Sequence, residues 1–342
     1  MTLTGLLIAL AMLLPDIIFS FYPVFSRRVI GVLAQLSSAV SFALWEWIAL
    51  ALALWLIVSL IRAMCKHRLL RWLSGVFFGV SVGVFLFVGL WGLNHFGPSL
   101  ASRLELEVRP STEEELRQAT AFYLSRANEL AAQANRGEDG LFSPGEFDAL
   151  ARQAGDGYKV LARENELFDG STVPVKRLMS SKLFAKMAIT GIFVDFTGES
   201  CISDQTYPAS LPYTMCHEIG HRMGFAAEDE ANFAAFLACD ASESLAFRYS
   251  GYFEAFCYCY SALYDIDPAA ANAVFAGAND YVYSDYCGAA VHYEQVVSQT
   301  ASTVSDTVNN TYLKVFSETS GTKSYGEVTD LLIAWYKENA GA

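Results

Sequence analysis

The chain has 342 residues, of which 53% are hydrophobic and only 17% are charged, and its net charge is −13 at pH 7. A soluble globular protein carries about 25% charged residues, so this composition is too apolar for a disordered chain and too acidic for a nucleic-acid-binding protein. The charge is also unevenly distributed: residues 1–94 carry a net +4, which leaves −17 for the remainder. We therefore expect a basic, apolar N-terminal part joined to an acidic domain, with no nucleic-acid partner.

Three apolar runs fill the N-terminal part, and each approaches the roughly 20 residues that a membrane span needs. The runs are Leu3–Phe21, Leu44–Ile61 and Trp72–Leu93. The first contains Pro15 and Asp16 but lacks the basic start and cleavage site of a signal peptide. We predict that residues 1–96 form a membrane anchor of three transmembrane helices in the lipid bilayer. Two spans with one interfacial segment are the alternative.

Basic residues predict the orientation of this anchor. Arg62, Lys66, Arg68 and Arg71 lie between the second and third runs. Positive charge stays on the cytoplasmic side, so we expect the 62–71 loop in the cytoplasm and residues 97–342 outside it, as one extracytoplasmic domain of a multi-pass cell-membrane protein. Two further arginines between the first two runs, in the segment 27–28, run against this orientation.

Six of the seven cysteines follow the anchor. In an oxidising compartment they allow up to three disulfides, whereas buried free thiols are the alternative. The six are Cys201, Cys216, Cys239, Cys257, Cys259 and Cys287.

The domain has the pattern of a mainly α-helical fold. Capping residues at 111–115 predict a helix to about residue 135, and the segment 143–146 predicts another helix start. Residues 189–204 are β-branched and aromatic around Thr197-Gly198, which predicts two short strands joined by a turn. Helical patterns resume near residue 213, and Ser324 is the expected cap of the last helix. We expect a helical domain with a small β-hairpin or sheet beside the functional helix.

One motif carries the chemistry. His217, Glu218 and His221 form the pattern HExxH. On a helix, positions four apart share a face, so both imidazoles can reach one zinc ion. Glu218 lies beside them, where it can accept a proton from a water that the zinc activates. The motif predicts one catalytic Zn²⁺, with His217 and His221 as metal ligands and Glu218 as the catalytic base.

The third ligand is predicted by a resemblance. Residues 228–232, with the sequence EDEAN, resemble the ExxA(D/N) element that carries the ligand glutamate of gluzincin-type metallopeptidases. This resemblance implies that Glu228 binds zinc and that Asn232 orients a ligand imidazole through a hydrogen bond. Only six residues separate His221 from Glu228, so Gly224 must end the first helix abruptly. Glu230 is the alternative ligand.

The longer stretch resembles a bacterial family of multi-pass membrane proteins classed as a domain of unknown function. That family carries HExxH followed by GFxxEDEANF, as residues 217–233 do here. Weaker similarities lie at 22–26, 41–44, 191–193, 211–212, 310–314, 324–325 and 331–332. The resemblance implies a membrane-anchored, zincin-like architecture but no particular substrate.

Other site candidates are less specific. His292 could donate a hydrogen bond to a tetrahedral intermediate, although a lone histidine is more often structural. Tyr312 is a comparable candidate within the resemblance. Either Gly191–Phe196 or Glu199–Ser203 could pair with an extended substrate.

Two functions remain open at this stage. The first is a membrane-anchored zinc metallopeptidase that hydrolyses a peptide or protein substrate outside the cytoplasm. The second is a non-catalytic, zinc-stabilised sensor or binding domain, against which the presence of Glu218 argues. Intramembrane proteolysis is excluded, because the motif follows the last apolar run by more than 100 residues and is too polar for lipid.

Overall fold

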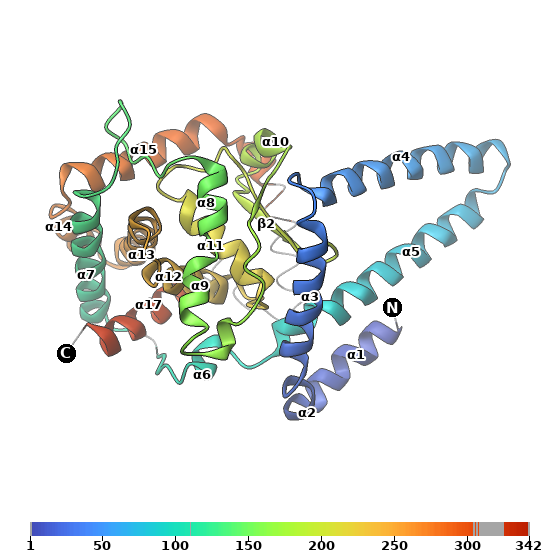
Figure 1. Ribbon diagram of the computed structural model, residues 1–342, viewed down its shortest axis with the longest axis horizontal. Coiled ribbons are helices and arrows are strands. Elements are labelled where there is room, and N and C mark those ends of the chain that lie inside the picture. The colour runs from blue at the N-terminus through green and yellow to red at the C-terminus, as the bar shows by residue number, and fades with distance from the viewer. Residues whose placement is uncertain (1, 110, 304, 306, 308–324, 341–342) are drawn as a thin grey trace.

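The computed structural model describes all residues except 1, 110, 304, 306, 308–324 and 341–342. It shows a mainly helical domain from which a long helical hairpin projects (Figure 1). The N-terminal helices are α1 (Thr2–Leu13), α2 (Pro15–Phe19), α3 (Tyr22–Ser37), α4 (Leu44–Cys65) and α5 (Leu69–Leu90). The domain helices are η1 (Gly92–Phe96), α6 (Leu100–Arg103), α7 (Glu113–Ala131), α8 (Phe147–Gln153), α9 (Asp156–Leu161), η2 (Glu166–Phe168), α10 (Ser181–Lys186), α11 (Leu211–Arg222), α12 (Glu228–Asp240), α13 (Leu245–Ile266), α14 (Pro268–Phe275), α15 (Asp280–Val296) and α17 (Tyr325–Asn339).

The hairpin consists of α4 and α5, which are both long and apolar enough to cross a membrane. The first predicted span is divided instead, because Pro15 cannot continue the helix and starts α2 after the break at Leu14. Helix α1 has only 12 residues and packs beside α5. In the described part of the chain, the structure therefore holds two candidate spans rather than three.

Helix α3 fills most of the segment between the first and second apolar runs. It packs against α5, α11 and the sheet. The buried Arg27 guanidinium donates to the backbone carbonyls of Glu166, at 3.1 Å, and Leu167. The Ser26 hydroxyl donates to the carbonyl of Leu90 at the end of α5, at 2.7 Å. Arg27 thus connects α3 to the segment around η2 in the domain.

The core of the domain lies where α7, α12 and α17 pack around α13. Helix α7 starts as predicted, since the side chain of Thr112 accepts from the Glu115 backbone and the Glu115 carboxylate accepts from the Thr112 backbone. Helix α8 starts at Phe147, three residues later than the start with Ser143 as cap that the sequence predicted. Gly145, at φ +109°, holds the preceding segment in a non-helical turn.

A three-stranded sheet lies beside α11, with strand order β1-β3-β2. The strands are β1 (Lys176–Arg177), β2 (Gly191–Val194) and β3 (Glu199–Ile202). As predicted, β2 and β3 are antiparallel and joined by a turn with Gly198 at φ +66°. The short β1 is parallel to β3 and was not predicted. Strand β3 is central, so β1 and β2 are the edge strands of this described sheet, and β2 packs against α11.

All seven cysteines are free thiols, so none of the possible disulfides is present. Cys201, Cys216, Cys239 and Cys259 are buried, as the alternative interpretation expected.

Candidate metal centre

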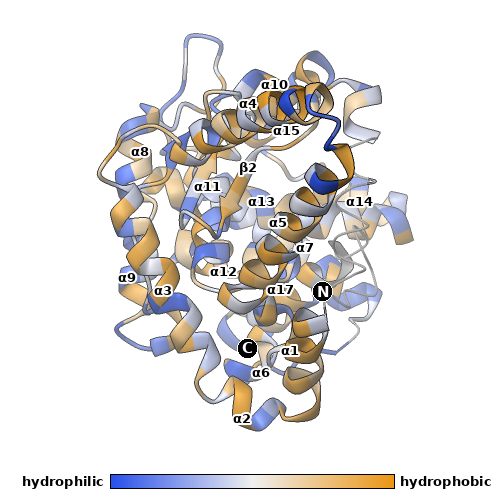
Figure 2. Cartoon of the chain, turned by 90° about the vertical axis from the view of Figure 1, so that its right-hand side faces the viewer, coloured by the Kyte–Doolittle hydropathy of each residue, from blue (hydrophilic) through white to orange (hydrophobic). Residues whose placement is uncertain are grey.

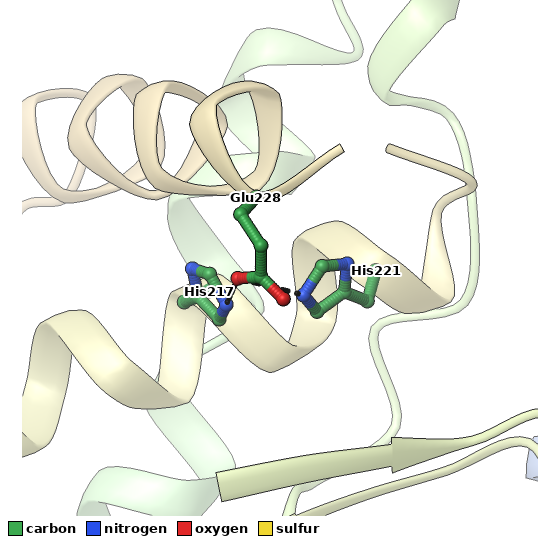
Figure 3. Close-up of side chains that lie close together, drawn as sticks. All are labelled: His217, His221 and Glu228. Atoms are coloured by element: carbon green, nitrogen blue, oxygen red, sulfur yellow. Dashed lines mark ion pairs between the residues drawn. The ribbon is translucent and has the colours of Figure 1, made fainter. Parts of the chain in front are cut away.

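Two histidines and a glutamate meet where α11 and α12 approach each other. Their ligand atoms all lie within 4.8 Å of one another. The Glu228 Oε2 atom is 3.3 Å from His217 Nε2 and 3.7 Å from His221 Nε2. Figure 3 shows the Glu228 carboxylate, at the start of α12, pointing between the two imidazoles of α11.

The end of α11 orients His221. Gly224 adopts φ +94° and closes the helix, so that the Phe225 N–H donates to the carbonyl of Gly220 at 3.2 Å. The same turn brings the Phe225 carbonyl to 2.8 Å from His221 Nδ1. When the His221 imidazole is neutral and its proton is on Nδ1, Nε2 carries the free lone pair and faces Glu228. The predicted abrupt helix end at Gly224 is confirmed.

These three side chains fit a zinc ion. Tetrahedral zinc binds nitrogen and oxygen at about 2.0–2.2 Å, which places neighbouring ligand atoms ~3.3 Å apart. The distances from Glu228 to the two histidines approach this value. The carbonyl of Phe225 supplies the hydrogen bond that a metal-binding imidazole normally makes with its other nitrogen. Two imidazoles and one carboxylate also leave a fourth position open, as in catalytic zinc sites.

Electrostatic attraction favours this arrangement. Burial lowers the pKa of His221, but the hydrogen bond and the negative charge of Glu228 outweigh burial and raise that pKa to about 9. Burial raises the pKa of Glu228, yet hydrogen bonds with both histidines hold it well below its usual range. The carboxylate is therefore anionic at neutral pH and suited to bind a cation.

Glu218 is buried on the side of α11 that faces the sheet. Its Oε2 atom has no hydrogen-bond partner in the described part of the chain, and burial raises its pKa. A Cβ atom on Gly191 would come within 2.5 Å of its Oε1 atom, so the space for this carboxylate depends on a glycine at the start of β2. An unpartnered buried carboxylate oxygen costs about 1–3 kcal/mol or more, and such a cost is typical of functional groups.

Two neighbouring predictions have different outcomes. Glu230 does not join the cluster, because its carboxylate accepts from the Leu100 N–H at 2.6 Å. Asn232 forms no hydrogen bond with either histidine among the described residues. The Tyr213 hydroxyl donates instead to the backbone carbonyl of Asn232 at 2.8 Å and lies 3.4 Å from its side-chain Oδ1. Tyr213 and Asn232 each lie one helical turn away from the ligands, so they meet in the next layer between α11 and α12. Among the described residues, the Phe225 carbonyl lies against Nδ1 of His221, whereas Nδ1 of His217 is buried without a hydrogen-bond partner.

The two weaker candidates are not part of the cluster. His292 lies on α15, with Nε2 2.7 Å from the carbonyl of Gln205 and its ring against Tyr207. These contacts give it a structural role. Tyr312 lies outside the described residues.

Sequence reasoning missed Trp91, which follows α5 directly. Its indole N–H donates to the backbone carbonyl of His221 at 2.8 Å, and its ring meets the His221 ring edge-on at 6.1 Å. The two residues are 130 positions apart, so no local pattern connects them. A tryptophan at the end of an apolar run is ordinarily explained as a membrane-interface residue.

Comparison with known proteins assigns the chain to a family. A search of curated proteins and a search of solved structures found no match. The model of one family, described as protein of unknown function (DUF3810), matches residues 20–333. That range includes α3, the candidate spans α4 and α5, the sheet and the whole candidate metal centre. The chain therefore belongs to the DUF3810 family.

Proposed function

We propose that this protein is a membrane-anchored zinc metallopeptidase. The observation that carries the proposal is the arrangement of His217, His221 and Glu228 within ligand distance of one another, beside the buried and unpartnered carboxylate of Glu218. Structural zinc sites are usually closed by four protein ligands and need no base, whereas catalytic zinc sites have three protein ligands and an open position.

Each residue of the candidate site would have a separate role in peptide hydrolysis. When bound, zinc supplies Lewis-acid polarisation of the scissile carbonyl and lowers the pKa of water. His217, His221 and Glu228 would hold the ion. Glu218 would take a proton from the attacking water and pass it to the leaving amine. The water oxygen bonds to the carbonyl carbon, the C–N bond breaks, and one carboxylate and one amine are released.

The sheet supports a substrate position. Strand β3 is paired on both sides, whereas no described residue hydrogen-bonds the outer edge of β2. Of the two segments that could pair with an extended peptide, β2 is therefore the better candidate. The position of Gly191 against the Glu218 carboxylate brings that edge to the catalytic base.

The proposal includes the membrane arrangement predicted from the sequence. Helices α4 and α5 would span the bilayer, with α1 and α2 as a third, broken apolar segment. The basic 62–71 loop would be cytoplasmic and the domain extracytoplasmic. In Figure 1 the loop and the domain lie at opposite ends of the hairpin, which supports placing them on opposite sides.

The test is metal content and peptide hydrolysis by the purified full chain in detergent. The full chain is needed because α3 and Trp91 contact the site from outside residues 97–342. Wild type is expected to bind one zinc and to cleave peptides from a mixed library.

The control variant Glu218→Gln should keep zinc and its melting temperature while losing about 10²–10⁴-fold in rate, the usual contribution of a general base. Zinc-loaded wild type without turnover, together with a Glu218→Gln variant that behaves identically, would instead indicate a non-catalytic zinc-stabilised domain.

A further inference from the structure

The two ends of the helical hairpin are attached on either side of the candidate metal centre. At the start of α4, the Glu199 carboxylate of β3 accepts from the backbone N–H groups of Leu44 and Trp45, at 2.8 and 2.9 Å. Directly after α5, Trp91 donates to His221. One end of the hairpin therefore holds the sheet and the other holds the metal-binding helix.

Strand β2 lies between these two attachments. Successive side chains of a strand point to opposite faces. Ile192 packs against the buried cluster that contains Ala43, directly before α4, whereas Phe193 packs against Trp91, with ring centroids 5.4 Å apart. Figure 2, which views the domain from the side of the hairpin, shows β2 between α4 and α5.

The lengths of α4 and α5 place this strand at a membrane surface. Each helix has 22 residues, which gives ~33 Å at about 1.5 Å per residue and matches a hydrocarbon core about 30 Å thick. A bilayer that contains both helices leaves Trp45 and Trp91 at the interface, where tryptophan is enriched. Phe196, directly after β2, is 48% exposed and would lie at the same level.

The β2–β3 turn is held at this level by α3. A Cβ atom on Gly198 would come within 2.6 Å of the Ile30 carbonyl and 2.5 Å of the Ala34 nitrogen, so the turn and α3 are in direct backbone contact. Helix α3 in turn is bonded to the last carbonyl of α5 through Ser26. The open edge of β2 is therefore fixed relative to the end of a candidate span.

From this geometry we propose that the substrates are membrane-anchored polypeptides, cleaved in an extended segment close to the bilayer surface. This inference rests on the proposed peptidase function. An extended chain rises about 3.3 Å per residue, so a segment within roughly ten residues of its own membrane span stays within ~33 Å of the bilayer surface. A soluble peptide would reach the same edge without being confined to the membrane plane.

The first test is independent of activity and measures the depth of the β2–β3 turn. In a chain carrying Cys65→Ser and Cys287→Ser, a nitroxide is attached at Phe196→Cys or, as a control, at Ser125→Cys on α7. Ser125 is exposed, and α7 lies on the far side of the domain from the hairpin (Figure 1). In phosphatidylcholine liposomes, the label at 196 should collide more with dissolved oxygen than with a water-soluble nickel chelate, and the label at 125 should show the reverse. Equal exposure of both labels to the chelate would overturn the proposed depth.

The second test compares three versions of one randomised ten-residue library. The library is placed directly after a single transmembrane helix, placed after the same helix with a 40-residue flexible linker, or supplied as free peptides. Products that wild type forms and Glu218→Gln does not form are counted by mass spectrometry in proteoliposomes. We expect cleavage of the membrane-proximal set to exceed that of the other two by tenfold or more.

The outcomes separate the two proposals. Equal or faster cleavage of the free peptides would overturn the membrane-proximal substrate while leaving the peptidase function intact. No cleavage of any set by the zinc-loaded protein would overturn the peptidase function, and the inference with it.

Discussion

At the scale of residues, the candidate metal centre consists of few contacts with distinct roles. Glu228 faces the two histidines, whereas Glu230, two positions later, turns toward Leu100. The difference follows from helix geometry, because positions two apart point to opposite sides of a helix. Helix geometry therefore predicts that Glu228 and not Glu230 is the third metal ligand, and the metal content of variants can test this.

Removing individual side chains should separate ligands from neighbours. His217→Ala and His221→Ala are expected to abolish stoichiometric zinc, and Glu228→Ala should weaken it severely, since each removes one of three protein ligands. Glu230→Ala is the matched control and should keep zinc. Metal analysis after dialysis against a weak chelator gives the readout. Loss of zinc in Glu230→Ala with retention in Glu228→Ala would show that the ligand is displaced by two positions.

Asp195, in the β2–β3 turn, should make stability depend on pH. Its side chain is only 6% exposed, and burial raises its pKa from 3.8 to about 6. Below about pH 4 the carboxyl is protonated in both folded and unfolded chains. Between pH 4 and 6 the unfolded chain loses this proton first, so stability falls as pH rises and levels off above pH 6.

The variant Asp195→Asn should therefore be more stable than wild type at pH 7.5, by about 1–3 kcal/mol, and should lose this advantage by pH 4. Melting temperatures of both proteins across this range provide the measurement. Asp148→Asn, at a carboxylate that is 77% exposed, is the control and should show little change. A constant difference between Asp195→Asn and wild type at every pH would contradict the assignment.

At the scale of elements, the boundary between α11 and α12 creates the site. Gly224, which has a positive φ, ends α11. The turn that follows places the Phe225 carbonyl against His221, and it reverses the chain so that Glu228 faces the two histidines. Strand β2, beside α11, also limits the space of the site, since only a glycine at position 191 leaves room for the Glu218 carboxylate.

Gly224→Ala should weaken zinc binding by straining this turn. A Cβ atom at Gly224 would meet only ordinary contacts, the nearest 3.5 Å away, so the cost comes from the φ of +94°. Such strain costs about 1–3 kcal/mol, and relaxing it would move the Phe225 carbonyl away from His221.

Gly140→Ala is the matched control for this variant, because Gly140 has φ +78° and open space around it in a surface loop. Both variants should lose stability, but only Gly224→Ala should lose zinc affinity in a competition titration with a chromogenic chelator. Equal zinc affinity in the two variants would show that the helix end does not position His221.

At the scale of the whole molecule, the hairpin separates two exposed thiols. Cys65 lies at the end of α4, at the tip of the hairpin, and Cys287 lies on α15 of the domain. The two are therefore natural reporters for opposite ends of the proposed membrane arrangement (Figure 1).

A membrane-impermeant maleimide should label Cys287 in intact cells and Cys65 only after permeabilisation, because the basic 62–71 loop is expected in the cytoplasm. The single variants Cys65→Ser and Cys287→Ser identify which thiol reacts. Labelling of Cys65 alone in intact cells would reverse the orientation and place the proposed peptidase inside the cell.

The sequence by itself determined the features that depend on local spacing. The two histidines four apart, the glycine that ends α11, the Thr112 cap and the strand–turn–strand at 191–202 all follow from interactions within a few residues. Tertiary structure decided what lies far apart in the chain. The docking of α3 with its buried Arg27 and the hydrogen bond from Trp91 to His221 have no periodic pattern in the sequence. These contacts form because tertiary packing brings together helices that are far apart in the chain. Local helix propensity does not determine which helices pack against each other. The metal centre is therefore separated from the last apolar run by more than 100 residues in sequence, yet it is one hydrogen bond away from the end of that helix in space.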